Sequence, residues 1–168
     1  MLNKFFASTT LATLLFATAA TSEQVPIVGN IQSKCSIYTD RQGVYGSPSP
    51  SLLSASPSAG GVRPIVRYDV AQGSYYTAKL EWPNAFSSSP SLSDAVNWTG
   101  DISVLEVSDS TMAGYESAKI SYDNIVEFDL TVAGSTWFTV DSTAAYGFDK
   151  SFPAGTYTAI VTAECIAN

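Results

Sequence analysis

Two cysteines carry the clearest chemistry in this sequence of 168 residues. Cys35 and Cys165 stand near opposite ends of the chain, without the Cys-x-x-Cys spacing of a redox-active dithiol and without a histidine that could join them at a metal. Both fall on the inward-facing positions of predicted strands, and the first and last strands of a sandwich are often neighbours. We therefore predict a structural disulfide between Cys35 and Cys165, with a bond between two copies as the alternative, and an oxidising compartment.

Groups that could catalyse a reaction are few. The sequence has no histidine, which removes the commonest general base and excludes Ser-His-Asp and Cys-His arrangements within the chain. We expect no enzyme, no cofactor and no metal, and a hydrolase that uses acids alone is the weakest alternative. Several acidic groups lack the regular spacing of a calcium loop and are better explained as solvated strand faces and turn caps: Asp94 with Asp101, Asp109 with Glu116, and Asp123 with Glu127 and Asp129.

The tryptophans offer a binding hypothesis. Trp82, Trp98 and Trp137 lie at the ends of predicted strands or in loops, where exposed rings can stack on the faces of sugars. The competing interpretation is that these rings pack over the edges of the sheets and close the core. A glycan-binding module that uses the three tryptophans is therefore our second functional hypothesis.

The first 20 residues read as an export signal. Lys4 gives a basic start, residues 5–20 form a short apolar run, and Ala17-Thr18-Ala19 fits the small-x-small rule for cleavage. The run is too short for a typical membrane span, although a retained anchor is the alternative. No second apolar run of spanning length follows. We predict a signal peptide at residues 1–20, a mature domain at residues 21–168, and a location in the periplasm, outside the cell or in a surface fibre.

The mature chain is acidic and long enough for one domain. The full sequence has fifteen Asp and Glu residues against eight Lys and Arg residues, a net charge of −7, and one of the eight, Lys4, would leave with the signal peptide. Nucleic acid and anionic lipid would repel such a chain, so we expect neither as a partner.

The apolar pattern has the period of β-strands. Side chains alternate between apolar and polar over residues 62–70, 75–82, 126–132 and 157–165, and shorter candidates are 102–107, 118–122 and 137–140. Turn residues separate these segments, which indicates an all-β protein with an antiparallel β-sandwich, or a closed barrel as the alternative. Residues 47–61 are rich in Ser and Pro and are predicted to form a long surface loop.

The segment before Cys35 also alternates. Val25, Ile27, Gly29 and Ile31 share one parity with Cys35. Pro26 lacks an amide donor, which places this part at the edge of a sheet. Gly29 leaves a gap in the apolar face, where another backbone or a large side chain could approach.

Both ends of the chain resemble one family. Residues 152–165 read Phe-Pro-Ala-Gly-Thr-Tyr-Thr-Ala-Ile-Val-Thr-Ala-Glu-Cys, and this resembles the final strand of chaperone–usher pilins and of spore-coat-U-type domains. Residues 25–37 resemble their first strand, with alternating apolar residues, a glycine and then a cysteine. Two features depart from the family pattern: the second cysteine lies in the last strand, and the segment before Val25 is short.

The resemblance implies an immunoglobulin-like sandwich that lacks its last strand, completed by an extended segment of a neighbouring subunit. It also implies self-association or other fibre subunits as partners, together with a periplasmic chaperone. Because little sequence precedes Val25, either the donor strand is the segment with Val25, Ile27, Gly29 and Ile31 itself, or the protein does not polymerise in this way. A structural subunit or accessory of a surface fibre is our leading expectation.

Overall fold

The computed structural model describes Pro26, Val28 and residues 34–147 and 149–168. The predicted signal peptide at residues 1–20 and the predicted donor residues Val25, Ile27, Gly29 and Ile31 lie outside the described residues. Residues 32–168 belong to one compact unit, and the fold described below is that of this unit.

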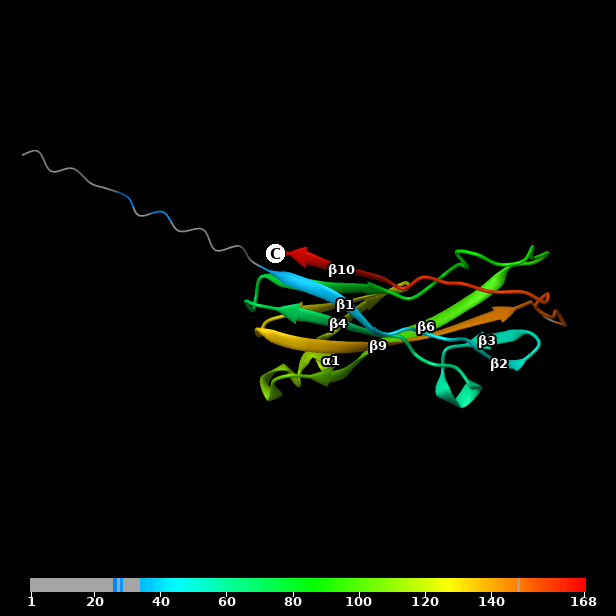
Figure 1. Cartoon of the computed structure of the whole chain (residues 1–168), viewed down its shortest axis with the longest axis horizontal. Coiled ribbons are helices and arrows are strands. Elements are labelled where there is room, and N and C mark those ends of the chain that lie inside the picture. Colours follow the sequence, from blue (N-terminus) through cyan, green and yellow to red (C-terminus); the bar gives the residue numbers. More distant parts are fainter. Residues whose placement is uncertain (1–25, 27, 29–33, 148) are drawn as a thin grey trace, which may run out of the picture. The chain divides into compact units, whose positions relative to one another are not determined.

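Antiparallel strands dominate the described residues and form two sheets (Figure 1). The six-stranded sheet has the order β1-β4-β9-β3-β2, and β6 pairs with the other side of β9. The four-stranded sheet has the order β10-β5-β8-β7. The strands are β1 (Cys35–Arg41), β2 (Gly46–Ser49), β3 (Leu52–Ser54), β4 (Ile65–Val70), β5 (Tyr76–Glu81), β6 (Val96–Val107), β7 (Ile120–Tyr122), β8 (Ile125–Leu130), β9 (Gly134–Tyr146) and β10 (Thr162–Ala167).

Strict alternation of side chains builds the core between the two sheets. On β4, Val66, Tyr68 and Val70 are buried, while Arg67 and Asp69 face outward, as the period of two predicts. Aromatic rings fill the centre: Phe138 packs against Tyr68 and Phe128 with centroid distances of 5.5 and 4.5 Å. The prediction of an all-β protein with two packed antiparallel sheets is confirmed.

Three predicted strands correspond directly to observed ones: 62–70 and 75–82 contain β4 and β5, and 126–132 overlaps β8, which begins one residue earlier. The predicted strand at 157–165 is displaced, because β10 begins only at Thr162. Before it, Thr158 forms an isolated bridge with Ser88. The ring of Tyr157 packs 5.1 Å from that of Phe152. Contacts with loops therefore hold residues 157–161 outside the sheet.

The prediction of a surface loop at residues 47–61 is wrong. This segment contains most of the hairpin β2–β3 and the 3-10 helix η1 (Pro57–Ala59). β3 pairs with the far part of β9, where Leu53 lies opposite Ala144 and is buried. Gly61 passes so close to β3 that a Cβ there would collide with the carbonyl oxygen of Ser54. Residues 47–61 form a hairpin instead of a loop because β9 is long. It extends beyond the end of β4, and β3 pairs with this extension.

The remaining elements lie beside β6. The 3-10 helix η2 (Ser110–Met112) and the short helix α1 (Tyr115–Ala118) connect β6 to β7. Met112 and Tyr115 are buried and join the hydrophobic core on this side of the sandwich. No helix within the described ranges has the length and apolar character needed to span a membrane.

Candidate functional site

The two cysteines are bonded within the chain. The Cys35–Cys165 disulfide joins β1 to β10, with a distance of 6.4 Å between the Cα atoms. β1 is an edge strand of the six-stranded sheet and β10 is an edge strand of the four-stranded sheet. The disulfide therefore links the edge strands of the two sheets at one position on this side of the sandwich. The predicted pairing of Cys35 with Cys165 is confirmed.

Beyond the disulfide this side of the sandwich is open. Ile37 lies opposite the buried Tyr68 in the pairing of β1 with β4, so its side chain faces inward, yet it is 37% exposed. On β10, Ala163 and Cys165 lie opposite the buried Leu80 and Ala78 of β5 and are only half-buried. We call these inward-facing residues of the two edge strands the β1–β10 seam: Cys35, Ile37 and Thr39 on β1, and Ala163 and Cys165 on β10.

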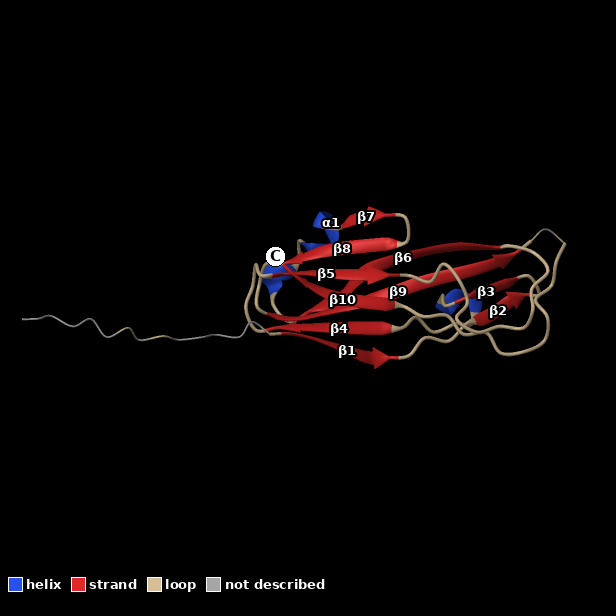
Figure 2. Cartoon of the chain, turned by 90° about the horizontal axis from the view of Figure 1, so that it is seen from above, coloured by secondary structure: helices blue, strands red, loops and turns tan. Residues whose placement is uncertain are grey.

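A hydrogen bond crosses the core beside the seam. The hydroxyl of Tyr68 on β4 donates to the carbonyl oxygens of Lys79 and Glu164, at 3.1 and 3.0 Å. This bond joins β4 to β10 across the core, and Figure 2 shows β4 and then β1 beyond β10 on this side of the sandwich. Burial raises the pKa of Tyr68 well above its ordinary value, so the hydroxyl keeps its proton and remains a donor.

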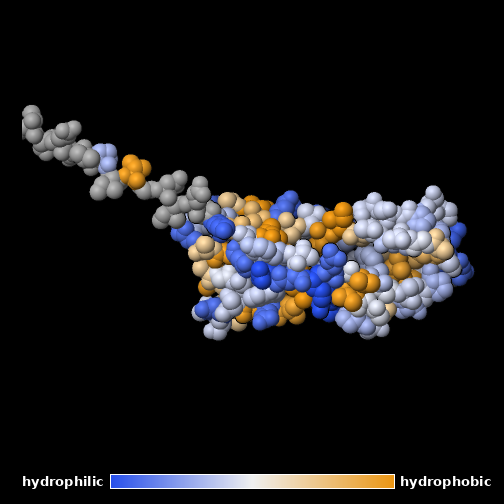
Figure 3. Space-filling model, in the orientation of Figure 1, coloured by the Kyte–Doolittle hydropathy of each residue, from blue (hydrophilic) through white to orange (hydrophobic). Residues whose placement is uncertain are grey.

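Both strands of the seam have an edge that pairs with no strand of the described part of the chain. β10 pairs only with β5, and β1 pairs only with β4. An unpaired edge presents a row of amide and carbonyl groups that can pair with another strand. Figure 3 shows apolar surface where β10 and the residues before it lie, and Ile160 and Ile166 are exposed there. The seam thus combines backbone groups with apolar side chains, which is the combination that strand addition requires.

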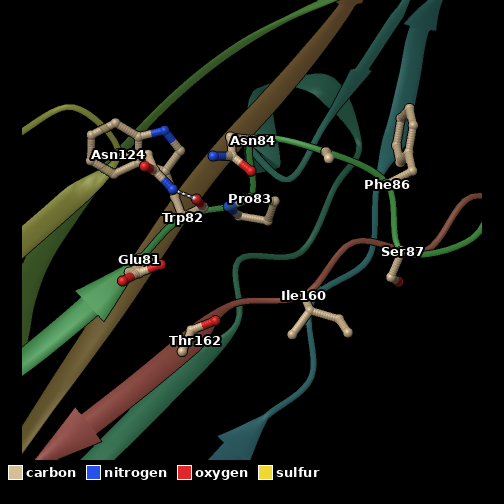
Figure 4. A pocket seen from close by; sticks show the side chains of 10 residues that line it. Glu81, Trp82, Pro83, Asn84, Phe86, Ser87, Asn124, Ile160 and Thr162 are labelled. Atoms are coloured by element: carbon tan, nitrogen blue, oxygen red, sulfur yellow. Dashed lines mark hydrogen bonds between the residues drawn. The ribbon is translucent and has the colours of Figure 1, made fainter.

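A second candidate site is a hollow at the end of β5 (Figure 4). Its volume is about 230 Å³, and its lining mixes aromatic, amide and hydroxyl groups. Asn124 donates from Nδ2 to the carbonyl oxygen of Trp82 at 2.8 Å, which fixes one wall. The residues that contribute to the walls include Glu81, Trp82, Asn84, Phe86, Ile160 and Thr162.

An adjoining hollow of about 300 Å³ shares Asn84 and Phe86 with the first and is also lined by Trp98. The rings around it pack mainly on one another: Phe86 lies 4.7 Å from Trp98 and 5.1 Å from Tyr157 between ring centroids. The ring of Trp82 lies against Gly100 of β6, where a Cβ would collide with it. Trp82 therefore lines the first hollow and Trp98 lines the second. Both rings also pack against other residues of the protein.

Trp137 belongs to neither hollow. It lies on the outward-facing row of the six-stranded sheet, where Tyr38, Arg67 and Trp137 are cross-strand neighbours. Its Nε1 donates to Asp40 at 2.7 Å, and the guanidinium of Arg67 lies 5.9 Å from its ring and 4.7 Å from that of Tyr38. The structure therefore brings two of the three predicted tryptophans together and leaves the third on a different surface.

Most of the acidic residues singled out in the sequence have local partners. Asp109 caps η2 by accepting from the amide of Thr111 at 2.8 Å, and the hydrogen bonds from Thr111 lower the pKa of its carboxyl group. Glu127 accepts from the hydroxyl of Tyr122 at 2.6 Å, and Asp101 pairs with Lys119 at 3.2 Å. Among the described residues no three Cys, Asp or Glu side chains converge as a metal site would require.

The seam was only partly visible in the sequence. Ile37 shares the parity of Cys35, which was the available signal, but the sequence does not reveal which strands lie at the edges of the sheets. Comparison with models of protein families, with curated proteins and with solved structures finds no match to this chain.

Proposed function

We propose that this chain is a secreted subunit of a surface fibre, in which residues 25–31 of one copy pair with the open edge of β10 on the next copy. One observation carries the proposal: β10 ends its sheet, while β4 and β1 of the other sheet extend beyond it (Figure 2) and the inward-facing Ile37 is left exposed. A strand added beside β10 would cover Ile37 and complete the four-stranded sheet on this side.

The chemistry of the proposed donor fits that place. Val25, Ile27 and Ile31 would bring large apolar side chains to inward positions where β10 has the small Ala163. Gly29 would leave room for the Cys35–Cys165 disulfide, which occupies part of the same space between the sheets. Burying an exposed Ile or Val side chain contributes about 1.5–3 kcal/mol, and the backbone hydrogen bonds add to this.

The resemblance to chaperone–usher pilins supports the same assembly. An immunoglobulin-like sandwich that lacks one strand has an open side of this kind, and the disulfide suits export to the periplasm or beyond. An apolar edge left open before assembly invites aggregation, so a periplasmic chaperone would cover it until the donor arrives. The role is one of assembly, with no catalytic step.

Negative-stain electron microscopy of the exported chain tests this proposal. The deletion of residues 21–30 and the substitution pair Ile27→Asp and Ile31→Asp should both abolish filaments while the remaining domain stays folded. Ile120→Asp on β7 is the matched control, because Ile120 is an exposed isoleucine at the other edge of the four-stranded sheet. Unchanged filaments in the donor variants would refute the proposal.

Glycan binding is a second candidate function, favoured by the two adjoining hollows. Aromatic walls from Phe86 and Trp98 beside the amide of Asn84 provide both a stacking surface and hydrogen-bonding groups. A sugar in these hollows should change the fluorescence of Trp98, and Asn84→Ala should weaken that response while Trp137→Phe leaves it intact. A glycan array without signal would count against this function.

A further inference from the structure

The open edge of β6 is covered by side chains instead of a strand. β6 pairs with β9 along one side, and within the described residues no strand pairs with its other side. Glu116 of α1 accepts a hydrogen bond from the amide of Val104 at 2.7 Å. Lys119, one residue beyond α1, donates to the carbonyl oxygen of Ile102 at 2.9 Å. The two side chains thus supply the acceptor and the donor that a neighbouring strand would supply.

Ion pairs hold the two side chains in place. Glu116 and Lys119 lie 2.8 Å apart, and Lys119 also contacts Asp101 of β6 at 3.2 Å. Partial burial alone would lower the pKa of Lys119, but hydrogen bonds from its ammonium group to Glu116 and Asp101 outweigh that effect and raise it. Tyr115 anchors the preceding turn, because its ring is buried and its hydroxyl accepts from the amide of Val132 at 2.9 Å.

A second feature protects the same edge. The pairing of β6 with β9 shifts register between Val104 and Glu106, so Leu105 lies at an irregularity and is 51% exposed. Bulges and charges at sheet edges are the devices by which β-proteins prevent pairing with other molecules. Leu105 is nevertheless apolar, so this stretch of β6 would be attractive to another strand if the side chains that cover it were removed.

We propose that the Glu116–Lys119 pair is a guard that keeps β6 from pairing with β6 of a second copy. The guard confines association to the β1–β10 seam, since the seam has no comparable cover in the described structure and β6 does. The partner excluded by the guard is a second copy of this chain, because its β6 presents the same donors, acceptors and apolar Leu105 in antiparallel register.

The test is the association state of the double variant Glu116→Ala, Lys119→Ala, measured by sedimentation velocity over a range of concentrations. Removing two backbone partners from the edge should raise the association constant roughly ten- to a hundredfold. The matched control is Lys79→Ala, Glu81→Ala, which removes an ion pair of 2.9 Å on β5, a strand that already has neighbours on both sides. The control should associate like the unmodified chain.

Two further variants separate the guard from other effects. Adding Leu105→Lys to the double variant should reverse the association. The two lysines at this exposed position, one on each β6, would repel each other when the strands of two copies pair. Introducing Ile27→Asp and Ile31→Asp should leave the new association intact, because these residues belong to the proposed donor for the seam. The comparison with and without Ile27→Asp and Ile31→Asp therefore tests the Glu116–Lys119 guard separately from the proposed fibre assembly.

If the double variant does not fold, Glu116→Gln and Glu116→Met replace it. Gln keeps an acceptor for the amide of Val104 and should associate like the unmodified chain, whereas Met removes the acceptor and should associate more strongly. Variants that associate no more strongly than the unmodified chain, or equal association of the Gln and Met variants, would overturn the proposal.

Discussion

The hydroxyl of Tyr68 on β4 donates to the backbone carbonyl oxygen of Glu164 on β10, 3.0 Å away across the interior of the sandwich. This contact ties the edge strand of one sheet to the second strand of the other. It lies on the side of the sandwich where β1 is uncovered.

Removing this hydroxyl should weaken the sandwich. Tyr68→Phe removes a buried hydrogen bond to the carbonyl oxygens of Lys79 and Glu164, at a cost of about 0.5–1.5 kcal/mol in the free energy of unfolding. Equilibrium denaturation by guanidinium measures the loss. Tyr38→Phe is the control, because Tyr38 is exposed on the outer face. Equal stabilities for the Tyr68→Phe variant and the unmodified chain would contradict the role given to this bond.

The same residue predicts a dependence of stability on alkaline pH. Burial raises the folded-state pKa of Tyr68 above the unfolded value of about 10, so above that pH the unfolded chain loses its proton first. The contribution of Tyr68 is fully present below pH 10 and declines as the pH rises towards the folded-state pKa. Tyr68→Phe should flatten the fall in unfolding free energy above pH 10, measured by urea titrations at successive pH values. An unchanged alkaline slope would contradict this account.

The disulfide should contribute strongly to stability. It closes a loop of 130 residues, for which the chain-entropy model gives about 5 kcal/mol as an upper figure. The double variant Cys35→Ala, Cys165→Ala and the unmodified chain with a reductant should therefore show similar, much lower midpoints of denaturation. A reductant should have no effect on the double variant itself. If reduction leaves the midpoint of the unmodified chain in place, the disulfide does not secure the two edge strands.

The hairpin that replaces the predicted loop can be tested through Leu53. Its side chain is 9% exposed, so Leu53→Ala should cost about 2–4 kcal/mol in the free energy of unfolding. Leu105→Ala is the matched control at an exposed position of β6 and should change the free energy by less than about 0.5 kcal/mol. Similar small effects at both positions would mean that residues 47–61 are a surface loop after all.

Local alternation made some strands predictable from the sequence and concealed others. In β4, β5 and β8 every inward side chain is aliphatic or aromatic, with hydroxyls only on Tyr68 and Tyr76, so the period of two is plain. In β9 the inward positions include Thr136 and Ser142, which are buried but polar. Ser142 lies 3.0 Å from the hydroxyl of Tyr45, a partner distant in sequence. The sequence therefore predicted only residues 137–140 of a strand that spans Gly134–Tyr146.

The candidate sites depend even more on distant contacts. The pairing of the two cysteines could be predicted because the chain has only two of them. The exposure of Ile37 follows from the order of strands and from the offset of the sheets, and neither is encoded in a local pattern. The same holds for the tryptophans: Trp82 and Trp98 adjoin because β5 and β6 bring them to one end of the sandwich, while the register of β9 places Trp137 on an outer face.

Hydrogen exchange of the β10 amides in assembled and unassembled protein tests the central claim most directly. Alternate amides of Thr162–Ala167 face the open edge, so the proposed donor strand should slow their exchange in filaments, while the Ile27→Asp, Ile31→Asp variant shows no such protection. If these amides exchange at the same rate in filaments as in single copies, the β1–β10 seam is not where one subunit receives the strand of the next.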